Sequence, residues 1–160
     1  MIDAALELRP LDAEACARIM SGDDAQAAAP EIARMTRDAA AAHLDLYAHT
    51  GATVPWIGYL AAEDGRVVGV CSFKGPPDGR TVEIAYWTFE PFEGRGVGGW
   101  MAGALLAIAA GSGAVDTVSA HTLPGPGAST RILQRLGFAF EGAVEDREDG
   151  TVWRWTRRAA

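Results

Sequence analysis

The chain has 160 residues, of which 49% are hydrophobic and 22% charged, and this length and balance are typical of one globular domain spanning residues 1–160. Two cysteines exclude a disulfide-stabilised scaffold. The formal net charge of −7 argues against a nucleic-acid or membrane partner attracted by overall charge, so any bound anion needs local backbone amides or a few arginines.

The N-terminal residues and one uncharged stretch bear on where the protein resides. Asp3 and Glu7 stand in a segment without an apolar run, so we expect no signal peptide and a cytoplasmic location. Gly96–Val115 has no charged residue, but its continuous apolar part, Trp100–Ala110, is too short to span a bilayer and predicts a buried helix.

Lys74 is the only lysine among the fourteen basic residues, and this arginine bias indicates a GC-rich bacterial genome.

The first half of the chain has the patterns of one strand, two helices and two further strands. Apolar spacing, prolines and glycines place their ends. We predict a strand at Leu6–Pro10, a helix from Pro10 to Ser21-Gly22, a polar loop at Asp23–Ala29, a helix from Pro30 to Gly51, and strands at Trp56–Ala62 and Arg66–Phe73 around a turn at Glu63–Gly65.

The second half alternates strands with helices and ends in a hairpin. We predict a loop at Lys74–Gly79, a strand at Thr81–Phe89, a helix at Val97–Ala110, a strand at Val115–His121, a loop at Leu123–Gly127, a helix at Ala128–Leu136, and hairpin strands at Phe138–Val144 and Thr151–Thr156. This order predicts an α/β (α+β) fold with a single mixed, largely antiparallel central sheet and helices on both faces.

A glycine-rich turn between the strand at Thr81–Phe89 and the next helix carries the clearest chemical signal. Glycines leave backbone N–H groups open to one concavity, and the helix N-terminus adds a partial positive charge. Arg95 within the turn adds a full charge. The turn therefore predicts a phosphate-binding cradle, and a tight turn without a ligand is the alternative.

Two other phosphate-binding motifs fit this turn poorly. Gly94, Gly96 and Gly99 match the dinucleotide pattern G-x-G-x-x-G, which needs an acidic residue at the end of the next strand. Asp116 stands at the beginning of that strand instead. A P-loop needs Gly-Lys-Ser/Thr, which the sequence does not contain.

Two segments resemble motifs of the GNAT acetyltransferases. Val82–Phe89 followed by Glu93-Gly-Arg-Gly-Val-Gly98 resembles motif A, whose pattern is Gln/Arg-x-x-Gly-x-Gly/Ala closely after a strand. Ala128–Phe138 resembles motif B in the form used by the ribosomal-protein (RimJ/RimL-like) branch. The resemblance extends from about Arg66 to Trp155, and the order of predicted elements also matches the GNAT fold.

The resemblance implies how an acyl donor binds. In this family the central strands splay apart, the pantetheine of acetyl-CoA fills the gap, and its pyrophosphate lies on the glycine-rich turn. No metal is implied. The resemblance assigns backbone bonds with pantetheine to Trp87, Thr88 and Phe89, the pyrophosphate site to Gly94, Arg95, Gly96, Val97, Gly98 and Gly99, and a further contact with the donor to Ser129.

Three positions depart from the family pattern. Glu93 stands where motif A usually has Gln or Arg, so Arg95 and the backbone are expected to hold the pyrophosphate. Pro126 replaces the usual motif-B asparagine, and Leu133 replaces the tyrosine that many members use as general acid. Ser129 is the remaining candidate for that acid.

Four residues are candidates for the chemistry that the resemblance implies. Glu83 aligns with the glutamate that many relatives use as base, and a solvated strand residue is the alternative. The backbone N–H of Trp87 is implied as donor to the thioester carbonyl, and Ser129 is either a proton donor or a helix cap. His121 could relay a proton, but we favour an ordinary loop histidine there.

Other reactive or aromatic residues have simpler interpretations. His43 and His49 are six residues apart on one helix, which does not match the spacing of a shared metal. The remaining expectations are buried thiols for Cys16 and Cys71, and a core or homodimer-interface position for Trp153 and Trp155.

Two acidic clusters are expected beside the acceptor mouth, which in this family lies between the N-terminal helices and the final hairpin. Such a rim could attract a cationic amine, but we favour an ordinary solvated surface. The clusters are Asp23-Asp24 and the hairpin acids Glu145, Asp146, Glu148 and Asp149, with Arg147 as their only positive neighbour.

The resemblance implies an N-acetyltransferase that moves an acetyl group from acetyl-CoA to a primary amine of a peptide or small molecule by direct attack. The alternative is a non-catalytic acetyl-CoA-binding module that regulates a partner. The sequence does not identify the amine.

Overall fold

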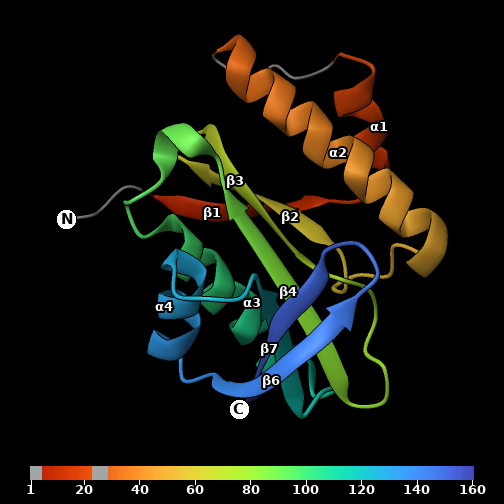
Figure 1. Ribbon diagram of the computed structural model, residues 1–160. Coiled ribbons are helices and arrows are strands. Elements are labelled where there is room, and N and C mark those ends of the chain that lie inside the picture. Colours follow the sequence, from red (N-terminus) through yellow and green to blue (C-terminus); the bar gives the residue numbers. More distant parts are fainter. Residues whose placement is uncertain (1–4, 23–28) are drawn as a thin grey trace.

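The computed structural model describes residues 5–22 and 29–160, and within them seven strands form one sheet (Figure 1). The strands lie in the order β1-β2-β3-β4-β5-β7-β6, and every pair is antiparallel except β4 and β5. The strands are β1 (Leu6–Leu11), β2 (Gly58–Glu63), β3 (Arg66–Phe73), β4 (Thr81–Thr88), β5 (Thr117–Thr122), β6 (Ala139–Asp146) and β7 (Gly150–Arg158).

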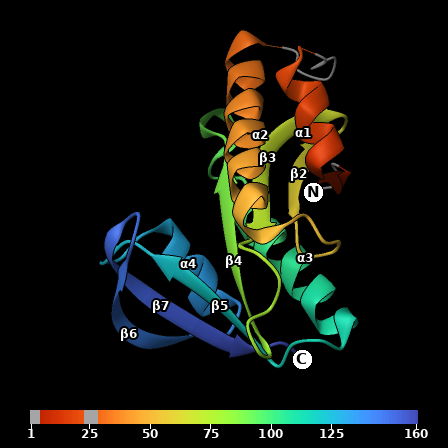
Figure 2. The ribbon, with the colours of Figure 1, turned by 90° about the vertical axis from the view of Figure 1, so that its right-hand side faces the viewer.

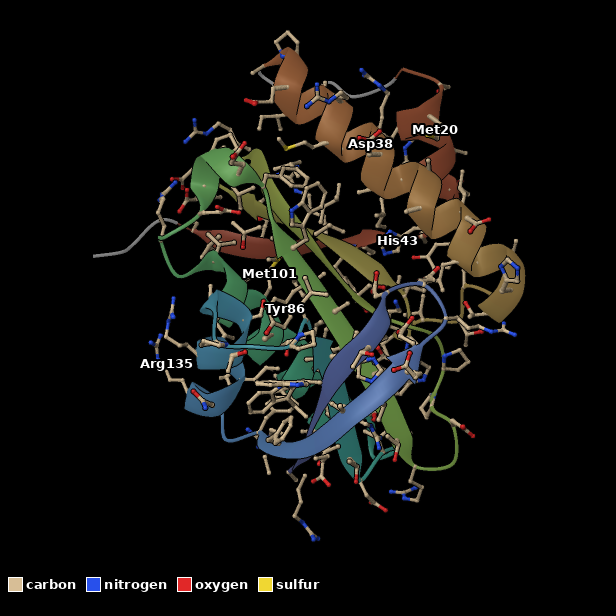
Figure 3. All side chains as sticks on the ribbon, viewed as in Figure 1. Met20, Asp38, His43, Tyr86, Met101 and Arg135 are labelled. Atoms are coloured by element: carbon tan, nitrogen blue, oxygen red, sulfur yellow. The ribbon has the colours of Figure 1, made fainter. Side chains whose placement is uncertain are left out.

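The α-helices cover opposite faces of this sheet, as predicted. A Cβ on Gly58 would collide with the His43 ring of α2, whereas a Cβ on Gly69 would lie 3.2 Å from Met101 of α3. Figure 3 shows His43 beside α2 and Met101 on the α3 side. The helices are α1 (Ala13–Met20), α2 (Pro30–Thr50), α3 (Val97–Ser112) and α4 (Ala128–Arg135), with a short 3-10 turn at Glu90–Phe92.

The start of the first helix is the main local correction. Pro10 does not begin α1; it lies inside β1, an edge strand, where the missing N–H is tolerated. The helix begins after Asp12, whose carboxylate accepts a hydrogen bond of 2.8 Å from the N–H of Ala15. The other predicted helices and strands are present with shifts of a few residues, and the predicted loop at 23–28 lies outside the described residues.

Strands β4 and β5 separate part-way along their length, which confirms the predicted splay. Thr81–Ile84 pairs with Thr117–Ala120, and the ladder then stops. Beyond this point β4 continues beside β3 while β5 continues beside β7. In Figure 2, β4 runs upward and β5 turns away from it. The two strands therefore form a V that is closed near Ile84.

The core includes both cysteines and Trp155, whereas Trp153 is only partly buried and packs against the core. Cys16 and Cys71 are 0% and 1% exposed, and burial raises the pKa of these thiols to about 11 and about 12, so both stay protonated near neutral pH. Trp155 is 3% exposed and its indole N–H donates to Thr122 Oγ1 at 3.0 Å. Of the helices in the described ranges, none combines the length and apolar character needed to cross a membrane.

Candidate active site

The register of β3 and β4 determines which backbone groups of β4 are left for a ligand. The N–H of Phe89 donates to Val68 O at 2.9 Å, and the N–H of Lys74 donates to Glu83 O at 2.9 Å. The register between these two bonds is constant. Because hydrogen-bonded and non-hydrogen-bonded pairs alternate in an antiparallel ladder, odd-numbered residues from Glu83 to Phe89 direct their backbone groups toward β3.

The even-numbered residues consequently direct their backbone groups into the V. Tyr86 and Thr88 lie beyond the last β4–β5 pair, so their N–H and C=O groups have no ladder partner on that side within the described chain. This corrects the expectation for Trp87 and Phe89, whose N–H groups face β3. The sequence alone does not show which residues of β4 direct their backbone groups toward β3, because that depends on the β3–β4 register.

The side chains of β4 follow the same alternation. Tyr86 and Thr88 lie on the α3 face, close to Gly98, while Glu83 and Trp87 lie on the α2 face. The Trp87 ring is 45% exposed and packs edge-on against Phe89 with centroids 5.0 Å apart. Glu83 and the Trp87 ring therefore lie on the face opposite α3 and α4.

The glycine-rich turn leads directly from the V to the N-terminus of α3. Gly94 and Gly96 have φ values of +79° and +86°, a region that strongly favours glycine, and Gly96 is the N-cap of α3. The first N–H groups of the helix have no acceptor within it. Val97 is 2% exposed, so only its backbone is available to a ligand.

Gly98 and Gly99 have different surroundings. A Cβ on Gly98 would lie 3.0 Å from Ile132 Cδ1 of α4, whereas a Cβ on Gly99 would meet nothing within 4 Å. Gly98 is thus needed for close packing of α3 against α4, and Gly99 borders open space. The open space beside the turn and the helix N-terminus suit a phosphate.

Arg95 differs from the expectation of a free phosphate-binding side chain. Its Nη2 donates to Glu63 Oε1 at 2.7 Å. The Glu63 side chain is only 7% exposed, and the Arg95 side chain is 46% exposed. The pair satisfies a buried carboxylate at the end of β2, and it neutralises part of the charge that Arg95 would offer to an anion. Glu93, the unusual motif-A residue, is exposed.

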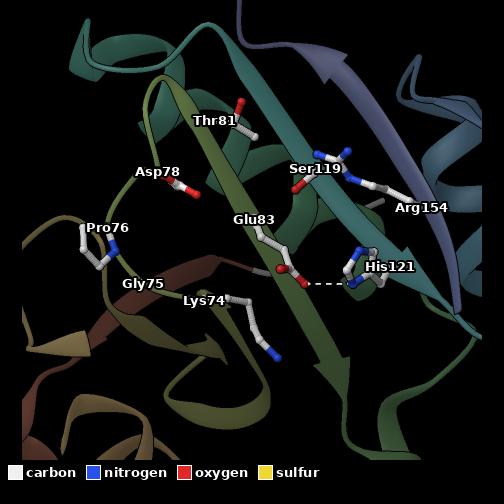
Figure 4. Close-up of a pocket in the computed structure, with 9 residues that line it drawn as sticks. All are labelled: Lys74, Gly75, Pro76, Asp78, Thr81, Glu83, Ser119, His121 and Arg154. Atoms are coloured by element: carbon white, nitrogen blue, oxygen red, sulfur yellow. Dashed lines mark ion pairs between the residues drawn. The ribbon is translucent and has the colours of Figure 1, made fainter. Parts of the chain in front are cut away.

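Glu83 and His121 come together at the closed end of the V. The Glu83 Oε2 atom lies 3.2 Å from His121 Nδ1, and Asp146 Oδ2 lies 3.7 Å from the same nitrogen. All three side chains are between 21% and 31% exposed. None of the described residues makes a well-aligned hydrogen bond with this nitrogen, although it is shielded from solvent. Figure 4 shows Glu83 directed toward the imidazole.

The interpretation of His121 as a loop residue is wrong, since it lies within β5. Glu83 pairs in register with Ser119, and His121 stands two residues further along the same face of β5. The strand alternation was visible in the sequence, but the pairing of β4 with β5 was not. That long-range pairing is what brings the imidazole to the carboxylate.

These residues belong to a cavity of about 440 Å³ on the α2 face of the sheet. The cavity contains carboxylates, cations and small polar groups, which suits a polar ligand. It is lined by Lys74, Gly75, Pro76, Asp78, Thr81, Glu83, Ser119, His121 and Arg154 (Figure 4).

On the opposite face, Ser129 is not a helix cap. Gly127 is the N-cap of α4, and the Ser129 side chain instead interacts with the hydroxyl of Tyr86. Burial raises the pKa of Tyr86 to about 12, although the interaction with Ser129 lowers it. Leu133 is 0% exposed in the core. The hydroxyl that sequence reasoning missed is therefore Tyr86, on β4 beside the V.

Both remaining histidines make local contacts with their own helix. His43 Nδ1 contacts Ala39 O and His49 Nδ1 contacts Asp45 O, both at 2.9 Å. Over residues 5–22 and 29–160, no three His, Cys, Asp or Glu side chains gather as a metal site would require.

Of the two predicted acidic clusters, the structure describes only the one in the hairpin. Asp23-Asp24 lies outside the described residues, and Asp146 reaches His121. The N–H groups of Glu148 and Asp149 donate to Asp146 Oδ1 and hold the pKa of that carboxyl below its usual range. Glu145 accepts a hydrogen bond of 2.6 Å from Thr151. Two hairpin acids therefore have partners within the hairpin itself.

Similar solved structures share this fold. A RimL ribosomal L7/L12 α-N-protein acetyltransferase in its apo form has a TM-score of 0.70 at 21% identity, covering 99% of this chain and 96% of that chain. The same kind of enzyme in complex with coenzyme A has a TM-score of 0.68 at 20% identity, covering 99% and 96%. An acetyltransferase from Salmonella typhimurium that modifies the N-terminal serine of ribosomal protein L7/L12 has a TM-score of 0.66 at 22% identity, covering 98% and 96%.

The sequence comparisons identify the family. No curated protein gives a significant sequence match. The family model described as an acetyltransferase (GNAT) domain matches residues 5–139, which is most of the chain and includes β4, the glycine-rich turn and α4. The chain therefore belongs to the GNAT acetyltransferase family.

Proposed function

We propose that this protein transfers an acetyl group from acetyl-CoA to a primary amine of a small molecule or peptide. The observation that carries the proposal is the V between β4 and β5, which has open backbone groups on one edge and a carboxylate–imidazole pair at its closed end. The open backbone edge suits an extended amide-containing chain, and the carboxylate–imidazole pair is suited to act as the proton acceptor.

The donor's binding site is argued from groups along one continuous edge. Tyr86 and Thr88 offer backbone N–H and C=O groups to the amides of pantetheine. The N-terminus of α3 follows within ten residues and offers N–H groups to the pyrophosphate. Release of Arg95 from Glu63 would add a side-chain donor there.

Glu83 is the proposed base. The amine must lose a proton as its nitrogen attacks the thioester carbon, and the Glu83 carboxylate lies at the apex where the V closes. His121 adjoins this carboxylate at 3.2 Å and is proposed to take the proton from it, and the Asp146 carboxylate, 3.7 Å from the same nitrogen, would stabilise the imidazolium. Asp146 accepts two backbone hydrogen bonds that favour its ionised form.

The remaining steps need one donor for the carbonyl oxygen and one for sulfur. The N–H of Tyr86, which faces the V, is the proposed donor to the carbonyl oxygen as it gains negative charge. A C–N bond forms, the C–S bond breaks, and the sulfur leaves as a thiolate. Ser129, whose side chain interacts with the Tyr86 hydroxyl, is proposed to protonate the thiolate.

A thiol-release assay with a panel of primary amines tests the proposal. We expect amine-dependent release of free CoA and an acetylated amine detected by mass spectrometry. Calorimetric titration with acetyl-CoA, carried out in parallel, reports binding separately from turnover. Binding without turnover of any amine would overturn the enzymatic proposal and favour a non-catalytic acetyl-CoA-binding module.

A further inference from the structure

The cavity around Glu83 contains two cations that the proposed chemistry does not use. Lys74 follows the end of β3 and Arg154 lies on β7, and both line the cavity. A base and an adjoining histidine would suffice to deprotonate an amine. The two cations therefore indicate a second recognition task within the same cavity.

Neither cation is neutralised by a direct ion pair. Within residues 5–22 and 29–160, no carboxylate approaches the Lys74 or Arg154 nitrogens to within 4.0 Å. The chain as a whole has 21 acidic residues against 14 basic ones, so a cavity that holds two cations beside its carboxylates differs from the acidic balance of the whole chain. By contrast, Arg80 and Arg95 each contact a carboxylate at 2.7 Å. An unpaired guanidinium in a cavity is suited to a planar anion such as a carboxylate.

The strand register places Glu83 between the two cations. The N–H of Lys74 donates to Glu83 O, so Lys74 is the direct neighbour of Glu83 on the β3 side. On the other side β4 is followed by β5 and then β7, where Arg154 pairs with His121. Neighbouring strands are about 4.8 Å apart, so Lys74 is one strand spacing from the base, and Arg154 is two strands across from it and two residues further along.

The side chains follow this arrangement. In Figure 4 the guanidinium of Arg154 lies beside Ser119, on the same side of Glu83 as His121, while Lys74 lies on the other side. Counting Lys74 and Arg154 against Asp78 and Glu83, the cavity lining has a formal charge of zero with neutral histidine. A cavity for a purely cationic amine would have an excess of carboxylates. This one presents both signs side by side.

We propose that the acceptor carries a carboxylate close to its amine, as in a free amino acid or a peptide beginning with Asp or Glu. This inference rests on the proposed acetyl transfer at Glu83. The amine lies at Glu83, and Arg154 binds the carboxylate through paired N–H donors, with Lys74 contributing positive charge. Arg154 is thus the residue that determines acceptor specificity.

Matched acceptors test the proposal with the intact protein. Initial rates are measured for each of several amino acids, its amide and its decarboxylated amine. Amidation lowers the basicity of the amine, so without carboxylate recognition the amide should be the better nucleophile at neutral pH. We expect the amino acid to have the higher kcat/KM. Equal or lower kcat/KM for the acids, with turnover of the amides intact, would overturn the proposal and leave acetyl transfer standing.

A second pair of acceptors distinguishes a free amino acid from an acidic peptide as the molecule that carries the carboxylate. C-terminally amidated Asp-Gly and Asn-Gly differ only in the acidic side chain. Preference for the Asp peptide without turnover of free amino acids identifies a peptide acceptor, and the reverse identifies an amino acid. Either result supports the amine-plus-carboxylate class, whereas no preference in either set contradicts it.

Variants of Arg154 link the preference to this residue. Arg154→Gln should raise KM for the acids by roughly 10- to 100-fold, the factor expected for charge-assisted hydrogen bonds, and leave KM for the amides unchanged. Arg154→Glu should reverse the preference toward diamines. Arg135→Gln, on α4, is the matched control. Unchanged acetyl-CoA affinity by calorimetry shows that each variant is folded, and equal KM effects on acids and amides would contradict the assignment.

Discussion

Glu83 and His121 are 38 positions apart in sequence and 3.2 Å apart in space. Neither residue is informative alone, since strand glutamates are usually solvated and lone histidines usually have local partners. Their contact at the closed end of the V is the basis for proposing Glu83 as the base.

Replacing the proposed base should affect the rate and not donor binding. Glu83→Gln keeps the shape of the side chain and removes its proton affinity, so kcat should fall by roughly 10²–10⁴-fold with acetyl-CoA affinity unchanged. Glu7→Gln, on the edge strand β1, is the control. If kcat of the Glu83→Gln variant stayed within a few-fold of the parent's, another group would have to accept the proton.

The hydroxyl pair on the other face makes a prediction about pH. Burial raises the pKa of Tyr86 to about 12, so this phenol stays protonated until well above the usual pKa near 10. The alkaline limb of the activity profile should therefore not come from Tyr86 below about pH 11.

Removing the hydroxyl of either Ser129 or Tyr86 should lower kcat. Ser129→Ala and Tyr86→Phe should each lower kcat, and the double variant should lose no more than the larger single loss, because the two hydroxyls act as one unit. Fully additive losses would show independent roles. Solvent isotope effects on kcat measure whether the proton transfer is affected.

The junction of β4 with α3 forms the proposed donor site, and its glycines differ in their conformation and surroundings. Gly96 adopts a positive φ at the N-cap, Gly98 allows α4 to approach, and Gly99 borders open space. A substitution at Gly98 would therefore disturb the packing of α3 on α4 as well as any phosphate contact. Gly99 is the better position at which to test the phosphate alone.

Gly99→Val should weaken acetyl-CoA binding while the fold is kept. Its Cβ would lean toward the helix N-terminus, where the pyrophosphate is proposed to lie, and would meet no protein atom within 4 Å. We expect at least a tenfold loss of calorimetric affinity and a Tm close to that of the parent. Gly103→Val, one turn further along α3 and equally unobstructed, is the matched control. Equal affinities for both variants would contradict the placement of the phosphate.

Over the whole molecule, the acidic hairpin could attract a cationic amine, although the sequence favours an ordinary solvated surface there. The structure gives Glu145 and Asp146 partners of their own and places Lys74 and Arg154 in the cavity. An acceptor with both an amine and a carboxylate has little net charge, so long-range steering should contribute little to its capture.

The dependence of kcat/KM on salt concentration distinguishes an acceptor of little net charge from a cationic amine. For amino-acid acceptors we expect kcat/KM to change less than about twofold between 0.01 and 0.3 M salt, a range over which screening of exposed charges is large. The double variant Glu145→Gln/Glu148→Gln should leave kcat/KM unchanged. A steep fall with salt, together with a preference for polyamine-like acceptors, would instead assign the acidic hairpin a role in substrate choice.

Local sequence patterns predicted most of the secondary structure and the resemblance to the GNAT family. Strand alternation, the glycine after α2, the Asp64-Gly65 turn and the glycine-rich turn are local signals, and each element lies within a few residues of its prediction. Pro10 was misassigned because proline is compatible with both a helix start and an edge strand, and only its pairing with Tyr59 distinguishes them.

The tertiary structure alone decided which groups reach the site. The β3–β4 register turned the N–H groups of Trp87 and Phe89 away from the V, and the β4–β5 register brought His121 to Glu83. Arg95 was drawn to Glu63 of β2, a contact between residues 32 positions apart. Strand pairing is a long-range interaction, and a shift of one residue exchanges the faces of a strand, so periodicity within one segment does not determine what that segment contacts.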